Sequence, residues 1–184
     1  MIFVCGISGL RHSIFASPLS RCACGAEDGT DEIVYFPELP SNSCLSSFEA
    51  DKRMHASSDG CFNQFVVDYL FAGEKREVVQ VRRLSGLLPR EEQDGQALDV
   101  SLLKIDVEGG EAQVLMGIDD CDWSSIHQVA MEIHSDELLA ECLLLIKPHY
   151  SRVWHQRQAI PGHHMLYAAR GPGPGPRLRA KEPV

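Results

Sequence analysis

The chain lacks any apolar run that approaches the ~20 residues needed for a transmembrane helix. Its first ten residues, MIFVCGISGL, are apolar, but the stretch is short and no positively charged segment precedes it. A secretory signal peptide carries such a basic segment. We therefore expect no membrane segment, no cleaved leader and a cytoplasmic location.

Positive charge is also scarce. Lysine and arginine together number 17 against 26 aspartates and glutamates, so the formal net charge is -9. A protein that binds nucleic acid or an anionic membrane needs a basic surface to neutralise phosphates. The charge argues against nucleic-acid and membrane partners and favours a small molecule as the acceptor or ligand.

The seven cysteines lack the spacing of a metal site. Cys22 and Cys24 are separated by one residue and no second pair answers them, whereas zinc sites usually place two or more residues between paired cysteines. An odd and scattered set also argues against a disulfide framework. We expect buried, reduced thiols, and we assign no metal ligand in the chain.

The 184 residues, 44% of them apolar and 23% charged, suit one globular domain with a packed core. No internal repeat is present. We expect an atypical N-terminal segment at residues 1–20, a folded domain at 21–170 and a disordered tail rich in glycine and proline at 171–184.

Hydrophobic periodicity predicts the elements of this domain. In its first half we expect two short strands around a turn at 27–30, a short helix at 61–73 and a half-buried strand at 77–84. In its second half we expect strands at 99–109 and 127–134, helices at 109–118 and 136–149, and a closing pair of strands at 150–158 and 163–170. The first of these helices groups Ala112, Leu115 and Met116 on one side. This alternation is typical of βαβ units and of a parallel sheet covered on both faces.

The sharpest motif is KIDVEGGE at residues 104–111. In an extended strand Lys104, Asp106 and Glu108 point to one face, and the two glycines that follow allow a tight turn into a helix. Glu111 then falls in the first helical turn, where a negative charge suits the helix dipole. The simpler interpretation is a solvated acidic rim at a strand-to-helix turn.

A second motif, Glu132-Ile133-His134, closes the next strand. Ligands of parallel sheets bind beyond the carboxyl ends of the strands, so neighbouring strands would bring Asp106, Glu108, Glu132 and His134 to one rim. These groups suit either a divalent metal ion or acid–base chemistry, for which His134 is the best candidate. A purely structural His134 is the alternative.

The remaining histidines show no convincing ligand spacing. The adjacent pair His163 and His164 precedes a strand, where neighbouring side chains face opposite sides. We therefore give this pair no metal role.

The segment SLLKIDVEGGEAQVLMGIDDCDWSSIHQVAMEIH at residues 101–134 closely resembles the signature of FkbM-type methyltransferases. There, a strand reading L-L-K-I-D-V-E-G-x-E leads into a helix ending in G-I, then W-x-x-I and a strand closing in E-x-H. Upstream, GAEDGTDEIVYFPELPSNSCL is similar to the family's glycine turn, short hairpin and P-x-x-P-x-N-S-x-L loop, and RRLSGLL fits the strand before the signature. The resemblance covers residues 21–170.

This resemblance implies an α/β fold with a class I, Rossmann-like methyltransferase sheet, mostly parallel with an antiparallel closing strand. It also implies S-adenosylmethionine as methyl donor and O-methylation of a hydroxyl on a small-molecule, sugar, polyketide or peptide acceptor. Asp106 and Glu108 would then border the cofactor. Three residues, His134, Glu132 and Asp106, would orient the acceptor or take its proton, while Asn42 and Ser43 would contact the substrate.

The sequence departs from the family pattern at its start. Family members begin with a strand, a glycine-rich D-x-G-x-x-x-G turn, a helix and a second strand whose acidic end holds the cofactor's ribose. Only about 20 residues precede the expected hairpin here, so we expect an incomplete sheet with a gap and unpaired backbone groups beside the KIDVEG strand. The first hypothesis is a methyltransferase whose sequence is incomplete, with the activity of the truncated chain left open. The alternative is a non-catalytic remnant that serves as a binding module. A metal-dependent hydrolase that uses the acidic patch is a third hypothesis.

Overall fold

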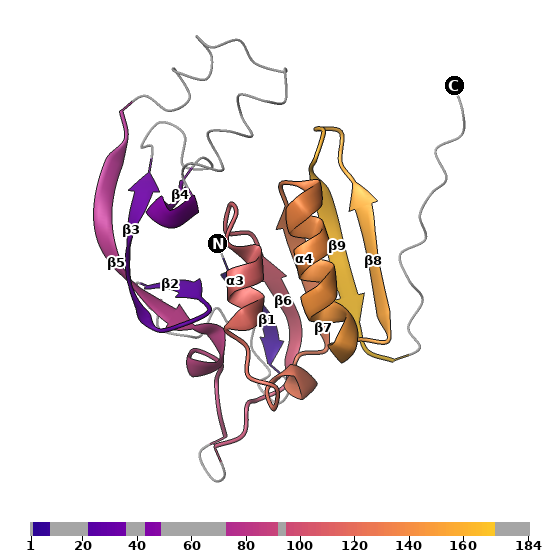
Figure 1. Ribbon diagram of the computed structural model, residues 1–184. Coiled ribbons are helices and arrows are strands. Elements are labelled where there is room, and N and C mark those ends of the chain that lie inside the picture. The colour runs from indigo at the N-terminus through magenta and orange to yellow at the C-terminus, as the bar shows by residue number, and fades with distance from the viewer. Residues whose placement is uncertain (1, 8–21, 36–42, 49–72, 92–94, 172–184) are drawn as a thin grey trace, which may run out of the picture.

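The computed structural model describes residues 2–7, 22–35, 43–48, 73–91 and 95–171, with the backbone alone for 2–7. These residues form an α/β structure with two mixed β-sheets (Figure 1). The elements are β1 (Ile2–Ile7), β2 (Cys22–Gly25), β3 (Gly29–Tyr35), β4 (Cys44–Leu45), β5 (Lys75–Arg83), η2 (Leu84–Gly86), β6 (Val100–Ile105), α3 (Glu111–Met116), η3 (Trp123–Ser125), β7 (Gln128–Ile133), α4 (Asp136–Ile146), η4 (Lys147–His149), β8 (Arg152–Arg157) and β9 (His164–Ala169).

The larger sheet has five strands in the order β1-β6-β7-β9-β8. Two neighbouring interior strands, β6 and β7, run parallel, with Leu103 opposite Val129 and Ile105 opposite Met131. The closing pair is antiparallel, as predicted, with β9 between β7 and β8. The prediction of a mostly parallel sheet is wrong for the described strands, because every other pairing in this sheet is antiparallel.

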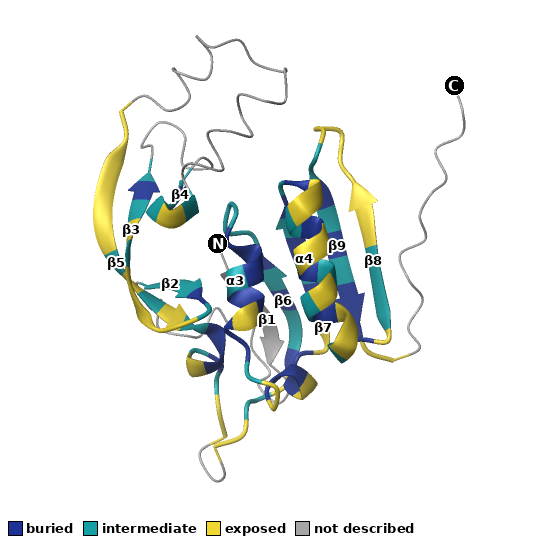
Figure 2. Ribbon diagram, in the orientation of Figure 1, coloured by how far each residue is buried: buried dark blue, intermediate teal, exposed yellow. Residues whose placement is uncertain are grey.

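The core lies between this sheet and the helices α3 and α4, which cover the same face of it (Figure 1). Leu103 and Ile105 of β6 and Met131 of β7 are fully buried and belong to one apolar cluster with both helices. Figure 2 shows the resulting pattern on α4, with an exposed side away from the sheet. We predicted that Ala112, Leu115 and Met116 share the buried side of α3. This is wrong at Met116, which is 38% exposed, because Val114 joins Ala112 and Leu115 on that side instead.

The edge of β6 that we expected to be unpaired is occupied. β1 runs antiparallel along it, from Ile2 opposite Ile105 to Ile7 opposite Val100. The expected gap beside the KIDVEG strand is therefore absent, because the N-terminal segment supplies a strand that satisfies the backbone groups of β6.

The smaller sheet has four strands in the order β2-β5-β3-β4. We predicted that the strands around the turn at 27–30 form a hairpin, and this is wrong. β5 lies between them, parallel to β2 and antiparallel to β3. The long strand β5 offers more pairing positions than β2, which has four residues. The predicted helix at 61–73 falls almost entirely outside the described residues.

The two sheets meet where β2 ends against the end of α3. A Cβ added at Gly117 would lie 2.3 Å from the carbonyl oxygen of Gly25 and 3.2 Å from the backbone nitrogen of Leu84. The Ser85 N–H also donates to the Gly117 carbonyl at 3.1 Å. Gly117 is therefore the point at which the smaller sheet docks onto the helix that begins at Glu111.

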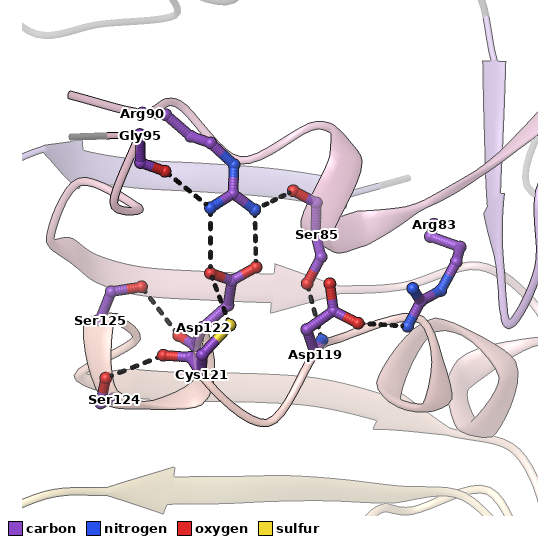
Figure 3. A network of polar contacts seen from close by, with 9 residues as sticks. All are labelled: Arg83, Ser85, Arg90, Gly95, Asp119, Cys121, Asp122, Ser124 and Ser125. Carbon is purple, nitrogen blue, oxygen red and sulfur yellow. Dashed lines mark hydrogen bonds and ion pairs between the residues drawn. The ribbon is translucent and has the colours of Figure 1, made fainter. Parts of the chain in front are cut away.

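A polar network fastens the loop after β5 to the loop before β7 (Figure 3). The Arg90 guanidinium donates to both carboxylate oxygens of the buried Asp122, at 3.3 and 2.8 Å, and to the carbonyls of Ser85 and Gly95. Arg83 pairs with Asp119 at 2.7 Å in the same network. A bidentate pair of this kind fixes both loops in one orientation.

The described cysteines are free thiols, and they are not uniformly buried. Cys44 and Cys142 are buried, Cys22 and Cys24 are half-buried, and Cys121 is exposed, so the expectation of buried thiols is wrong for Cys121. Among the residues that the structure describes, no helix has both the length and the apolar character needed to cross a membrane.

Candidate functional site

The segment between β6 and α3 turns more sharply than the sequence suggested. β6 ends at Ile105, and Glu108 has a φ of 60°, in the left-handed region, followed by Gly109 with a φ of 114°. We had predicted that Lys104, Asp106 and Glu108 share one face of a strand, and this is wrong: only Lys104 lies in β6, Asp106 follows its last residue, and Glu108 lies in the turn. Gly109 is required here because other residues rarely adopt its backbone conformation.

A buried carboxylate holds this turn together. The Glu111 side chain, which is 0% exposed, accepts hydrogen bonds from the backbone N–H groups of Val107 and Gly109 at 3.1 to 3.3 Å. Burial raises the pKa of Glu111, and the nearby His134 and the backbone donors only partly oppose that effect. The sequence suggested a helix-dipole role for Glu111, but it gave no sign that the side chain points inward.

The Phe48 ring packs against the same turn. A Cβ at Gly110 would lie 3.0 Å from Phe48 Cε2, and one at Gly109 would lie 3.4 Å from Phe48 Cβ. The short helical turn at 46–48, which follows β4, therefore brings the smaller sheet to the end of β6. Ser43, predicted to contact the substrate, is half-buried just before β4, and Asn42 lies outside the described residues.

His134 stands at the end of β7, between two carboxylates. Its Nε2 atom lies 3.6 Å from Glu108 Oε2, and its Nδ1 atom lies 3.8 Å from Glu111 Oε1. The imidazole is 18% exposed, and Nδ1 is buried with no hydrogen-bond partner among the described residues. The parallel pairing of β6 and β7 thus brings together side chains that are far apart in the sequence.

Asp106 is held by the neighbouring Lys104, whose Nζ atom lies 2.8 Å from Asp106 Oδ2. Burial raises the pKa of Asp106, but the hydrogen bond and positive charge of Lys104, helped by His134, outweigh burial and keep the pKa below its ordinary value. Asp106 is therefore a carboxylate at neutral pH, suited to accepting hydrogen bonds and poorly suited to taking up a proton.

Glu132, His134 and His163 form a cluster in which one ligand atom from each side chain lies within 4.8 Å of the others. All three side chains are half-buried, and the rings of His134 and His163 meet edge to face at 4.9 Å. We had given His163 no role. The signal that could have found it is strand pairing: Ile133 lies opposite His164, so the residues just beyond them, His134 and His163, meet.

The other histidines that the structure describes lie elsewhere. His164 is buried and its Nε2 lies 2.7 Å from Asp136 Oδ1, which agrees with our expectation that His163 and His164 face different sides. His127 lies near Asp99 at 3.4 Å, and His149 stacks on Trp123. The polar rim at the ends of β6 and β7, made of Lys104, Asp106, Glu108, Glu111, Glu132, His134 and His163, is therefore the candidate site.

Comparisons with known proteins point to one family. The family described as "Methyltransferase FkbM domain" matches residues 9–154. The chain is 34% identical over 116 residues to "Methyltransferase sdnD" of Sordaria araneosa, an alignment that covers 61% of this chain and 44% of that protein. It is 32% identical over 126 residues to "Methyltransferase 1" of Beauveria bassiana, covering 66% of this chain and 46% of that protein.

A third relative is bacterial. The chain is 31% identical over 154 residues to "31-O-demethyl-FK506 methyltransferase FkbM" of Streptomyces tacrolimicus, covering 77% of this chain and 56% of that protein. The chain thus spans about half the length of these relatives. No solved structure matches it.

Proposed function

Because the chain belongs to the FkbM methyltransferase domain family, we propose that it serves S-adenosylmethionine-dependent methyl transfer to a hydroxyl group of a small-molecule, sugar, polyketide or peptide acceptor. Family membership supports methyl transfer as the general reaction. The name of the Streptomyces relative specifies a substrate that lacks a methyl group on oxygen, which supports a hydroxyl acceptor. The parallel pair β6 and β7 would be the part of a Rossmann-like sheet that this chain contributes.

One observation carries the proposal: His134 Nε2 lies 3.6 Å from Glu108 Oε2 where two parallel strands end. In open α/β sheets this edge is the usual place for a ligand. Asp106 and Glu108 would accept hydrogen bonds from the cofactor, in keeping with the lowered pKa of Asp106. Ser43 and Asn42, from the segment before β4, would contact the acceptor.

For this reaction the protein has to hold the two reactants in position and supply a proton acceptor. The acceptor oxygen attacks the methyl carbon in line with the carbon–sulfur bond, whose electron pair passes to sulfur, so the sulfonium becomes a neutral thioether. The hydroxyl proton has to leave the oxygen, and an imidazole exchanges protons near neutral pH. We assign proton acceptance to His134, with Glu132 and Asp106 orienting the hydroxyl. Holding both reactants in line supplies much of the acceleration.

The cofactor half of this proposal is tested by calorimetry. We expect S-adenosylmethionine to bind the chain, and Asp106→Asn and Glu108→Gln to weaken binding at least tenfold. The control is His155→Gln, an exposed histidine on β8. Absence of binding to the unaltered chain would contradict the proposal and favour a non-catalytic module.

The acceptor half is tested by transfer of a labelled methyl group to a panel of hydroxylated polyketides, peptides and sugars. Loss of a general base lowers turnover by about 100-fold or more. We expect His134→Gln to produce a loss of this size while its affinity for S-adenosylmethionine stays within threefold of the unaltered chain. Unchanged turnover in this variant would rule out His134 as the base.

A further inference from the structure

We propose that Glu132, His134 and His163 form a binding site for one divalent transition-metal ion. The three side chains come from the end of β7 and from the residue that precedes β9, and the antiparallel pairing of these strands fixes them relative to one another. They offer one carboxylate oxygen and two imidazole nitrogens, all within 4.8 Å of one another. Our sequence analysis assigned no metal ligand, although it noted that the groups at this rim suit a divalent ion, and it gave His163 no metal role.

The donor set selects a class of ion. Two imidazoles and one carboxylate are the ligands of Zn²⁺, Fe²⁺, Co²⁺ and Mn²⁺ sites, whereas Mg²⁺ and Ca²⁺ prefer oxygen donors throughout. Metal–ligand bonds of about 2.1 Å place neighbouring donors about 3 to 3.5 Å apart. Since the donors lie within 4.8 Å of one another, the cluster needs to contract by at most about 1.3 to 1.8 Å, which rotation of half-buried side chains can provide.

The surroundings of His134 fit a metal ligand. A histidine that binds a metal usually donates its other ring N–H to a carboxylate, which fixes the tautomer and the ring orientation. Here Nδ1 is buried, lacks a hydrogen-bond partner among the described residues, and faces the buried Glu111 Oε1 at 3.8 Å. An ion on Nε2 would keep the proton on Nδ1, directed at Glu111. Glu108 Oε2 also lies 3.6 Å from Nε2, outside the set of three mutually close donors.

Three protein ligands leave coordination positions open. A bound ion would polarise a hydroxyl that reaches one of these positions and so ease the loss of its proton. This consequence rests on the proposed function, whereas the binding site itself does not. Because an ion on Nε2 occupies the lone pair that a base needs, His134 would then act by holding the ion.

The test is a titration of chelator-treated protein with Co²⁺, followed by visible absorption, and with Zn²⁺, followed by calorimetry. We expect the unaltered chain to bind one equivalent more than either Glu132→Gln or His163→Gln. The matched control His155→Gln changes an exposed histidine outside the cluster and should keep the full stoichiometry. Bound Zn²⁺ should also raise the melting temperature of the unaltered chain more than that of the two ligand variants.

Equal stoichiometry and affinity in the unaltered chain and both ligand variants would overturn the proposal, since binding would then lie at other histidines or cysteines. Both substitutions are close in size to the native side chain at half-buried positions, and if one variant fails to fold, the other decides. Zinc binding without S-adenosylmethionine binding would refute methyl transfer and leave the metal site standing. Binding of S-adenosylmethionine without binding of zinc would refute the metal site and leave the proposed methyl transfer standing.

Discussion

Replacing Gly117 with alanine tests the docking of the smaller sheet on α3. The backbone of Gly117, with φ of −76° and ψ of 0°, is accessible to any residue, so the glycine is not required for its conformation. It is required for space, because a Cβ would lie 2.3 Å from the Gly25 carbonyl oxygen. That atom belongs to the backbone and cannot rotate away, so β2 would have to move by about an ångström from α3.

The cost follows from two opposing effects. A Gly→Ala change in a compatible backbone stabilises by about 0.4–1 kcal/mol through the unfolded chain. Overpacking against a rigid neighbour costs about 1–3 kcal/mol and occasionally more. Since the three nearest atoms, from Gly25, Leu84 and Val114, all belong to the backbone, we expect the upper end, a net loss of about 2–3 kcal/mol in the free energy of unfolding. With a urea m-value of about 2 kcal/mol/M, the midpoint should fall by about 1 to 1.5 M.

The matched control is Gly86→Ala, at the end of η2, where a Cβ would meet nothing within 4 Å. This variant should unfold within about 0.5 kcal/mol of the unaltered chain or slightly above it. The reasoning fails if Gly117→Ala and Gly86→Ala unfold at the same urea concentration. Equal midpoints would mean that β2 can move away from α3 without a loss of stability.

Three other expectations follow from the structure. Arg90→Ala leaves the Asp122 carboxylate, 3% exposed, without its bidentate partner and should cost about 3 kcal/mol in urea unfolding. In contrast, Arg82→Ala removes an ion pair with Asp28 that is about half exposed and should cost under about 0.5 kcal/mol. Equal losses of stability in the two variants would contradict the difference between the buried and the exposed pair. Iodoacetamide at pH 8 should label the exposed Cys121 before the half-buried Cys24, because burial, aided by Cys22, raises the pKa of Cys24 to about 12. Peptide mass spectrometry that finds the two labelled equally in the folded chain would refute this. Burial raises the pKa of Asp31, but hydrogen bonds from Ser46, Ser47 and the Glu32 N–H outweigh it and hold the pKa below its ordinary value. Asp31 therefore stabilises the fold above about pH 4 and loses that effect as the pH falls through its folded pKa. The urea midpoint of Asp31→Asn should then decline less from pH 5 to pH 3 than that of the unaltered chain. Parallel curves would show that Asp31 does not contribute.

Much of the second half of the chain could be predicted from local patterns. The apolar runs at 99–109 and 127–134, each ending in polar residues, predicted β6 and β7, and the helical spacing of DELLAECLLLIKPH predicted α4. The Ser135 hydroxyl, which accepts from the Leu138 N–H at 3.1 Å, caps α4 where the sequence changes from strand to helix. These features depend on neighbours a few residues away, and a single sequence reports those directly.

Strand partners were less accessible. The predicted hairpin at 27–30 failed because β5, about 50 residues later, pairs with both of its strands. Alternation shows that a segment has one buried face, but it does not say which strand lies beside it. The same limit explains β1, whose pairing with β6 replaced the gap that we had expected.

By itself the sequence determined the family, through a signature in which order and spacing agree, and it identified the acidic and imidazole groups that follow the two best strands. Only the tertiary structure decided that Glu111 lies buried behind His134 and that His163 lies beside His134. The roles of these groups in binding and catalysis remain predictions. The physical reason for the division is that burial and side-chain proximity arise from contacts between elements distant in the chain, and those contacts form only when the sheet and its helices pack together.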